Sequence, residues 1–126
     1  MDLGLEGKVA LVTGASKGIG LGIAQALACE GTRVAMASRS RDRIDAAARS
    51  VPGARGFVHD TSDVAAAPGL VRSVQEELGP VEILVVSTGG PPAFANPLEP
   101  TIDDFRSAYE SLMLGSVAIV QAALPG

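Results

Sequence analysis

Eight residues near the N-terminus, TGASKGIG at positions 13–20, have the types and the spacing to bind a phosphorylated ligand. They follow an apolar run at residues 8–12 and precede a helix-like stretch at residues 21–30. Glycines in such a turn let the backbone approach an anion without an intervening β carbon, and the next helix points its free N–H groups at that anion. We therefore expect residues 16–20 to bind the pyrophosphate of a dinucleotide. The alternative is a turn whose glycines only reverse the chain.

Length and composition limit the class of protein. A chain of 126 residues suffices for one domain, and we expect residues 1–126 to form a single one. Ten basic and 14 acidic residues give a net charge of −4, which argues against a nucleic-acid partner. The only cysteine, Cys29, is expected to be a small core residue in a reducing compartment. The N-terminal sequence MDLGLEGK lacks the apolar run of a secretory signal, so we expect a cytoplasmic protein.

Residues 111–126 carry no charge and need to be tested as a membrane segment. The segment is shorter than the roughly 18 apolar residues that a spanning helix needs, and it contains Ser116, Gln121 and Pro125. We predict a buried or interface helix there, and no membrane partner.

Short apolar runs alternate with helical patterns along the chain. Strands are expected at residues 8–12, 33–37, 56–58 and 82–86, and helices at residues 18–30, 41–50, 64–78 and 102–123. Gly31 is suited to end the first helix, Ser62 or Asp63 could cap the third, and Thr101 could cap the fourth. This alternation predicts an α/β fold, a Rossmann-like doubly wound parallel sheet of four βα units in the order 3-2-1-4. The proline-rich segment at residues 89–100 would leave the carboxyl edge of that sheet and form a wall of the substrate pocket.

The wider pattern TGxxxGxG resembles that of the short-chain dehydrogenase/reductase family. The resemblance runs from about Leu5 to Gly126 and covers the cofactor-binding N-terminal half of a family member. It implies hydride transfer between a nicotinamide cofactor and a carbonyl or alcohol substrate. The residues of the turn that would bind the cofactor are Gly14, Ser16, Lys17, Gly18, Ile19 and Gly20.

The residues after the second strand bear on the choice between NAD and NADP. A carboxylate there would accept a hydrogen bond from the ribose 2′-hydroxyl, whereas an arginine can pair with a 2′-phosphate. The chain has Ser38 and Arg39 at this place, with no acidic residue before Asp42, and Lys17 adds a second positive charge. In the family this combination commonly accompanies NADP, so we expect NADP rather than NAD. The alternative is that Arg39 is a solvated residue before a helix.

The end of the third strand would meet the adenine. Asp60, which is followed by Thr61, aligns with a family aspartate that holds the adenine amino group. Thr61 is expected beside it at the cofactor. The neighbouring His59 is therefore expected to face adenine rather than to act as a general base.

Two departures from the family pattern follow. Where the family usually has Asn-Asn-Ala-Gly, this chain has Val86, Ser87, Thr88 and Gly89. We still expect the last three of these at the cofactor. Leu112 stands where the family commonly has an asparagine of a proton relay, so the usual relay is not expected here.

We expect no catalytic residue in this chain and no metal site. The family uses a tyrosine as general acid or base, with a lysine four residues later on the same helix. The single tyrosine, Tyr109, is followed at that distance by Met113, and Lys8 and Lys17 both precede it. Tyr109 is therefore expected to pack on an apolar helix face with Phe105.

Three hypotheses for function remain. The leading one is an NADP-dependent oxidoreductase whose catalytic half lies outside the quoted sequence. The second is a noncatalytic NADP-binding module or subunit, and the third is a fragment that binds nothing.

The fourth helix and the fourth strand both indicate assembly. The helix carries apolar residues around more than one face, and in the family the equivalent helix packs against its copy, so a homo-oligomer is expected. The apolar fourth strand would lie at a sheet edge, which either further chain or a second molecule should cover.

Overall fold

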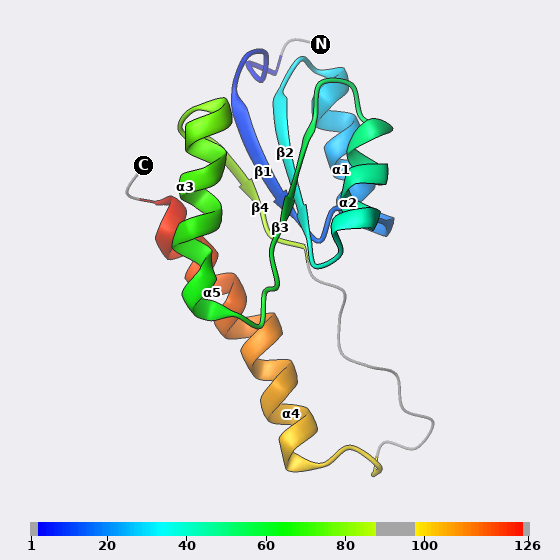
Figure 1. The fold of residues 1–126 in the computed structure, drawn as a ribbon, viewed down its shortest axis with the longest axis vertical. Coiled ribbons are helices and arrows are strands. Elements are labelled where there is room, and N and C mark those ends of the chain that lie inside the picture. The colour runs from blue at the N-terminus through cyan, green and yellow to red at the C-terminus, as the bar shows by residue number, and fades with distance from the viewer. Residues whose placement is uncertain (1–2, 88–97, 125–126) are drawn as a thin grey trace.

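The computed structural model describes residues 3–87 and 98–124 and shows a parallel sheet between two layers of helices (Figure 1). One sheet contains four strands in the order β3-β2-β1-β4. The α/β fold and the strand order expected from the sequence are therefore confirmed. The strands are β1 (Val9–Thr13), β2 (Arg33–Ser38), β3 (Arg55–Val58) and β4 (Ile83–Val85). The helical segments are α1 (Gly18–Cys29), α2 (Arg41–Arg49), the 3-10 turn η1 (Val64–Ala66), α3 (Ala67–Leu78), α4 (Ile102–Tyr109), the π-helical turn η2 (Glu110–Leu114) and α5 (Gly115–Ala123).

Strand β1 occupies the interior of the sheet. Leu11 pairs with Ala35 of β2 on one side and with Leu84 of β4 on the other. All residues of β1 are buried, because strands flank it and helices cover both of its faces. This burial explains why the run is apolar throughout instead of alternating with polar residues.

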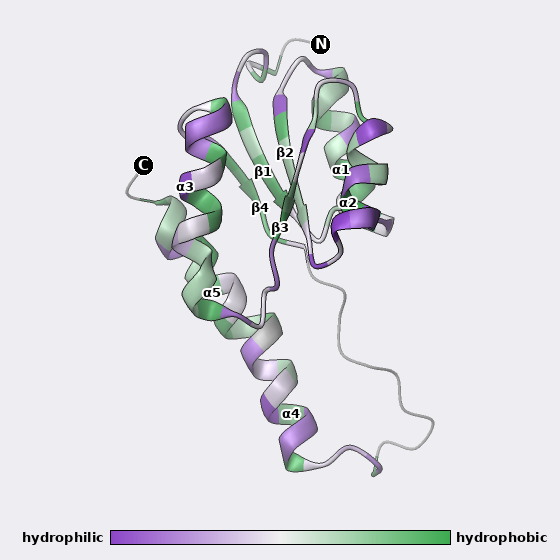
Figure 2. Cartoon of the chain, viewed as in Figure 1, coloured by the Kyte–Doolittle hydropathy of each residue, from purple (hydrophilic) through white to green (hydrophobic). Residues whose placement is uncertain are grey.

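The sheet separates two apolar clusters. Leu11 and Ile119 belong to the cluster under α3 and α5, whereas Val12 and Ile44 belong to the one under α1 and α2. Figure 2 shows apolar strands between helices of mixed polarity. The core thus holds the sheet rigidly and brings the carboxyl ends of its strands to one edge.

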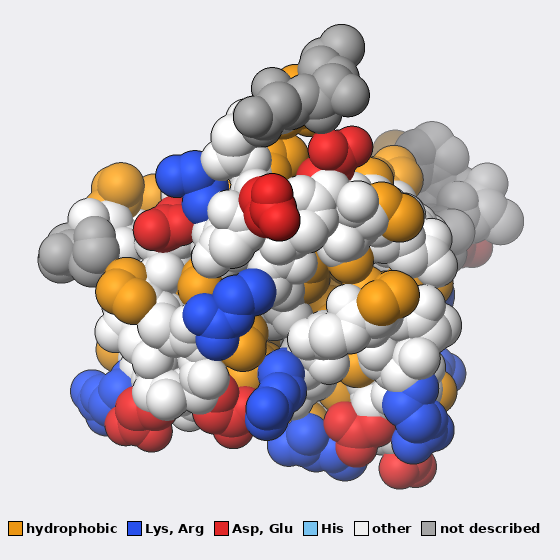
Figure 3. All heavy atoms as spheres, turned by 90° about the horizontal axis from the view of Figure 1, so that it is seen from above, with side chains coloured by type: hydrophobic (Ala, Val, Ile, Leu, Met, Phe, Trp, Pro, Cys, Tyr) orange, Lys and Arg blue, Asp and Glu red, His pale blue; other side chains and the backbone are white. Residues whose placement is uncertain are grey.

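Charges of both signs share the opposite end of the molecule. Figure 3 views it from the end at which the strands begin, where basic and acidic side chains lie next to one another along one edge. Apolar side chains lie between them. This face therefore offers neither a purely basic nor a purely acidic surface.

The expected end of α1 is confirmed, and the expected cap of α3 is wrong. Gly31 has φ +83°, and the N–H of Thr32 donates to the Leu27 carbonyl at 3.1 Å, which closes α1. Helix α3 instead follows the turn η1, and its N-terminal capping position is Ala66. Asp63 does precede η1 directly, but its side chain makes no capping hydrogen bond. The hydroxyl of the expected cap Ser62 donates to Asp60 at 2.7 Å, so it is engaged elsewhere.

The fourth predicted helix is divided into α4, η2 and α5. The cap at Thr101 is confirmed: its hydroxyl accepts from the Asp104 N–H at 3.2 Å, and the Asp104 carboxylate accepts from the Thr101 N–H at 2.7 Å. The Ser116 hydroxyl donates to the Leu112 carbonyl at 2.8 Å within the π turn. Among residues 3–87 and 98–124, no helix is long and apolar enough to span a membrane.

Cys29 was expected in the core and is exposed instead. It lies in the last turn of α1, away from the face on which Gly20 and Ala24 are buried. Tyr109 and Phe105 share an apolar helix face as expected, but 54% and 59% of their surfaces are exposed in this chain. Helix α4 has no buried residue, because it extends beyond the carboxyl edge of the sheet (Figure 1).

Gly115 makes the closest approach between α5 and the loop after β3. A β carbon at this position would collide with the carbonyl group of Thr61 and would lie 3.2 Å from the Thr61 β carbon. A glycine is therefore needed here for space, although its backbone is helical with φ −60°. The first turn of α5 thereby positions the loop that follows β3.

We predict that Gly115→Ala destabilises the protein by about 1–3 kcal/mol, since the new methyl group must displace the backbone of Thr61. Gly22→Ala is the matched control, because Gly22 lies inside α1 with no atom within 4 Å of an added β carbon. The control should be neutral or stabilise by up to about 1 kcal/mol through helix propensity. Urea denaturation of both variants measures the difference, and equal midpoints would contradict the close contact.

Candidate functional site

The turn after β1 folds back on itself at three glycines. Gly14 and Gly18 have φ values of +58° and +61°, a conformation that other residues rarely adopt. A β carbon on Gly20 would collide with the Gly14 carbonyl oxygen and would lie 3.2 Å from the Ala15 α carbon. The N–H of Ala15 also donates to the Ala37 carbonyl at 3.1 Å. The turn is thus tied to β2, and α1 starts directly above the end of β1.

A cavity of about 750 Å³ opens at the carboxyl end of the sheet. Residues from the glycine turn, from the ends of β2 and β3, and from the segment after β4 line it. Lining residues predicted from the sequence are Gly14, Ser16, Lys17, Gly18, Ile19, Ser38, Arg39, Thr61 and Ser87. The volume falls within the range of pockets that hold small ligands and cofactors.

The remaining predicted residues lie elsewhere. Gly20 does not line the cavity, but its close contact with Gly14 shapes the turn that does. Asp60 is exposed and lies outside the lining. Thr88 and Gly89 fall outside the described residues, as does most of the proline-rich segment expected to form a pocket wall.

Two lining residues, Ser40 and Arg43, were not predicted at the cofactor. His59, which was expected to face adenine, also lines the cavity. Along β3 and just beyond it, Phe57 is buried, Val58 exposed, His59 buried and Asp60 exposed. This period of two places the imidazole on the inner side and the carboxylate on the outer side.

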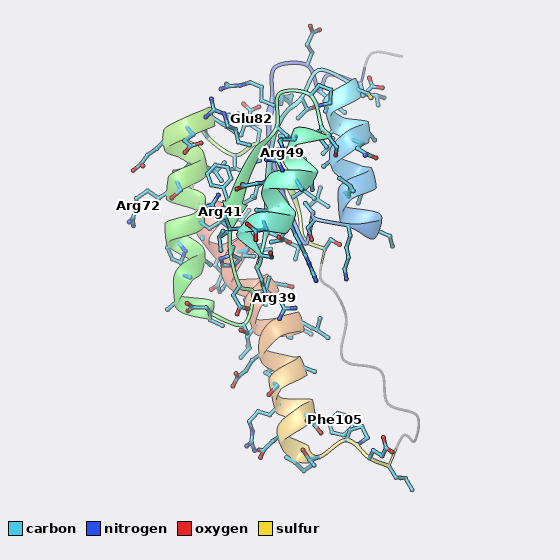
Figure 4. All side chains as sticks on the ribbon, turned by 45° about the vertical axis from the view of Figure 1, so that its right-hand side comes forward. Arg39, Arg41, Arg49, Arg72, Glu82 and Phe105 are labelled. Atoms are coloured by element: carbon cyan, nitrogen blue, oxygen red, sulfur yellow. The ribbon has the colours of Figure 1, made fainter. Side chains whose placement is uncertain are left out.

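The lining carries three basic residues and, in the described part of the chain, no carboxylate. Lys17 comes from the start of α1, Arg39 from the segment after β2, and Arg43 from α2. Figure 4 shows Arg39 at the carboxyl end of the sheet, whereas Arg49 lies at the far end of α2. An excess of positive charge in a concave site attracts anionic ligands.

The hydroxyl of Thr13 joins the end of β1 to the segment that follows the edge strand β4. Its Oγ1 donates to the Ser87 carbonyl at 3.2 Å and accepts from the Ser87 N–H at 3.1 Å. Thr13 is 1% exposed, so water does not compete for these bonds. Ser87 is therefore held through its backbone at the cavity wall.

The Asp60 carboxylate is oriented by Ser62. Its Oδ1 accepts from the Ser62 hydroxyl at 2.7 Å and from the Ser62 N–H at 2.9 Å. These bonds hold the pKa of Asp60 below its usual value, and the bond from the hydroxyl has the larger effect. The positive charge of Arg39 lowers the pKa of Asp60 further. Asp60 is thus an ionised acceptor at neutral pH, as its predicted contact with an adenine amino group requires.

The imidazole of His59 is held in its neutral form. The residue is 6% exposed, and its backbone N–H donates to the Ser38 carbonyl at 2.9 Å. Burial lowers the pKa of His59, and the charges of Asp60 and Asp63 offset this effect in part. His59 therefore presents an uncharged surface to the cavity at neutral pH.

Comparisons with known proteins give consistent matches. The family model described as short chain dehydrogenase matches residues 8–126. The D-threitol dehydrogenase of Mycolicibacterium smegmatis is 35% identical over 125 residues, which cover 96% of this chain and 48% of that protein. The chain thus spans about half the length of this relative.

Two solved structures are similar in both fold and sequence. The first is the L-sorbose reductase of Gluconobacter frateurii, complexed with NADPH and L-sorbose. Its TM-score is 0.87 at 32% identity, and the match covers 99% of this chain and 49% of that one. The second is an actinorhodin polyketide ketoreductase variant with NADPH. Its TM-score is 0.85 at 31% identity, with 93% and 46% covered.

We predict that His59 makes the protein less stable on mild acidification. The unfolded imidazole takes up a proton as the pH falls through about 6.5, whereas the folded one resists it because its pKa is lowered. The contribution of neutral His59 to the free energy of unfolding is therefore fully present above about pH 6.5. It decreases as the pH falls toward the folded pKa, by at most about 1.4 kcal/mol per pH unit. The measurement is the melting temperature at about pH 7.5 and 5.5, a window above the titration of carboxylates such as Asp60.

The variant His59→Gln should lose less stability than the parent chain over the same pH interval, because glutamine does not titrate. An equal loss in both proteins would assign the pH dependence to another group.

Proposed function

We propose that this chain, which belongs to the short-chain dehydrogenase family, is the NADP(H)-binding part of an oxidoreductase. In this proposal the substrate is a small carbonyl or alcohol compound. The short-chain dehydrogenase family is the same one whose TGxxxGxG pattern the sequence of this chain resembles. In this proposal the glycine turn binds the diphosphate, and the end of β2 binds the phosphorylated ribose. When bound, the nicotinamide supplies the hydride chemistry.

The observation that carries the proposal is the charge of the cavity. Lys17, Arg39 and Arg43 line it, and no carboxylate does so among residues 3–87 and 98–124. NADP differs from NAD by a 2′-phosphate of charge about −1.5 to −2 at neutral pH, which a guanidinium can bind through two parallel hydrogen bonds. The glycine turn also fits a diphosphate, since a β carbon on Gly20 would not leave room for this turn.

The similar structures support this choice of cofactor. Both the L-sorbose reductase and the polyketide ketoreductase contain NADPH, and the chain matches each at more than 30% identity. The substrates of these relatives are a sugar and a polyketide, so they suggest a carbonyl or alcohol class without indicating one compound.

The proposal assigns cofactor binding to these 126 residues and proton transfer to residues outside them. Tyr109 is the single tyrosine, and Met113 stands where the family's lysine would follow it. Its side chain is half exposed on α4, which has no buried residue. We therefore give Tyr109 no role in catalysis.

This lack of a Tyr-x-x-x-Lys sequence also favours a second candidate, a noncatalytic NADP-binding module. The two are distinguished by NADPH oxidation with a panel of carbonyl compounds, using the longest natural form of the chain. Turnover supports the oxidoreductase. Binding of NADPH without turnover across the panel supports the module.

We predict that NADPH raises the melting temperature by several degrees, because a ligand that binds only the folded state stabilises it, and that NADH does so less. Arg39→Ala should weaken NADPH binding about tenfold and leave NADH binding nearly unchanged, since only NADPH has the 2′-phosphate. Arg72→Ala is the control, because Arg72 points away from α3, outside the cavity (Figure 4). No shift at millimolar NADPH would refute both functions and favour a fragment that binds nothing.

We also propose that the chain assembles through α4 and the segments that follow it. Exposed apolar side chains on these segments are Ile102, Phe105, Tyr109, Met113, Leu114, Val117 and Val120. Contiguous apolar surface of this kind is typical of an interface between proteins. A second copy of the same helix would cover it with like residues, as a twofold interface requires.

We predict that Phe105→Asp shifts the protein from an oligomer toward a monomer with little loss of stability of the single chain, because Phe105 is 59% exposed on a helix that has no buried residue. Light scattering after size-exclusion chromatography measures the mass. Arg106→Ala on the same helix is the control, since it removes only the exposed ion pair with Asp103. A monomeric parent protein at high concentration would contradict the assembly.

A further inference from the structure

Arg43 lines the cavity from the first turn of α2. The Ser40 hydroxyl accepts a hydrogen bond from the Arg43 N–H at 3.3 Å and so caps the helix. Ser40 itself lines the cavity, and the Ser38 hydroxyl donates to the Ser40 carbonyl at 3.4 Å. The backbone that carries Arg43 is thus fixed at the cavity rim before any ligand arrives.

The neighbouring arginine on the same helix has a different role. Arg41 donates to Asp45 at 3.3 Å and does not line the cavity. Within residues 3–87 and 98–124, the ion pairs are Arg41–Asp45, Arg55–Glu77 and Arg106–Asp103. Arg43 takes part in none of them. Its guanidinium is therefore available to a ligand in the cavity.

The charge balance also favours an anion of more than one negative charge. Lys17, Arg39 and Arg43 place three like charges around one cavity, where they repel one another in the absence of a ligand. Lys17 belongs to the glycine turn, whereas Arg39 follows the end of β2 and Arg43 lies four residues later in the first turn of α2. In a doubly wound fold the ribose of a dinucleotide lies at that second place.

We propose that Arg43 is a specificity-determining residue that binds the 2′-phosphate of NADP(H) together with Arg39. This inference rests on the proposed function and deepens it, because it assigns the recognition of one phosphate to two guanidinium groups. A phosphomonoester has three oxygens and a charge of about −1.5 to −2 at neutral pH, so one arginine neutralises it only in part. The second arginine supplies the remaining charge and further donors.

The test uses nucleotide fragments, which separate phosphate recognition from the nicotinamide. Binding of adenosine 2′,5′-bisphosphate, adenosine 3′,5′-bisphosphate and adenosine 5′-monophosphate is measured by titration calorimetry for the parent chain and for Arg43→Ala. We expect the variant to bind the 2′,5′-bisphosphate about tenfold more weakly and the monophosphate within about twofold of the parent. The parent should also prefer the 2′,5′-bisphosphate over the 3′,5′ isomer, and Arg43→Ala should reduce that preference.

Arg41→Ala is the matched control, since it removes an equal charge from the same turn but from a residue outside the cavity. It should leave all three affinities unchanged. Melting temperatures of both variants close to that of the parent chain show that the fold is intact. Arg43→Lys keeps the charge and loses the planar pair of donors, so its affinity should lie between those of the parent and Arg43→Ala.

Two results would overturn the inference. If Arg43→Ala binds the 2′,5′-bisphosphate as tightly as the parent, or loses the monophosphate to the same extent, Arg43 does not recognise the 2′-phosphate. That result leaves the proposed function standing as long as the parent binds NADPH. If the parent binds neither NADPH nor the 2′,5′-bisphosphate, the proposed function and this inference both fail.

Discussion

The contact between Gly20 and the Gly14 carbonyl is the constraint on which the site depends. It brings the first turn of α1 against the end of β1, and no side chain larger than hydrogen fits at Gly20. Gly14 and Gly18 are needed for a different reason, their positive φ values. Two conformational requirements and one steric requirement therefore combine in a turn of a few residues, and together they direct the start of α1 toward the cavity.

The parallel sheet supplies the rest of the geometry. Because all four strands run in the same direction, the segments after β1, β2 and β3 emerge at one edge and can share one cavity. The paired bonds between Thr13 and Ser87 hold the segment after β4 at the same edge. This contact uses the backbone of Ser87 rather than its side chain, so it does not depend on the residue type at this position.

The family and the chain differ in extent. The similar proteins are about twice as long, and the 126 residues here carry the glycine turn and a sheet of four strands. The helical segments after residue 101 divide in the same way. Ile119 of α5 is buried in the core, whereas apolar residues such as Phe105 and Met113 are exposed and add little to the stability of this chain by burial.

Local patterns were enough to predict the strands, most helix ends and the cavity's glycine turn, because each depends on the residues themselves. The end of α1 at Gly31 and the cap of α4 at Thr101 use hydrogen bonds between residues at most five positions apart. The strand order also followed from alternation of strands and helices, since few topologies connect such units.

The sequence by itself determined which residues make the α/β sheet and the glycine turn, because periodicity, caps and glycine positions act over short distances. Only the tertiary structure decided which side chains meet. It exposed Cys29 and Tyr109, brought Arg43 and His59 to the cavity, and set Gly115 against Thr61. These outcomes depend on how far each helix extends over the sheet and which of its faces the sheet covers. Those distances are set by packing between segments remote in the chain.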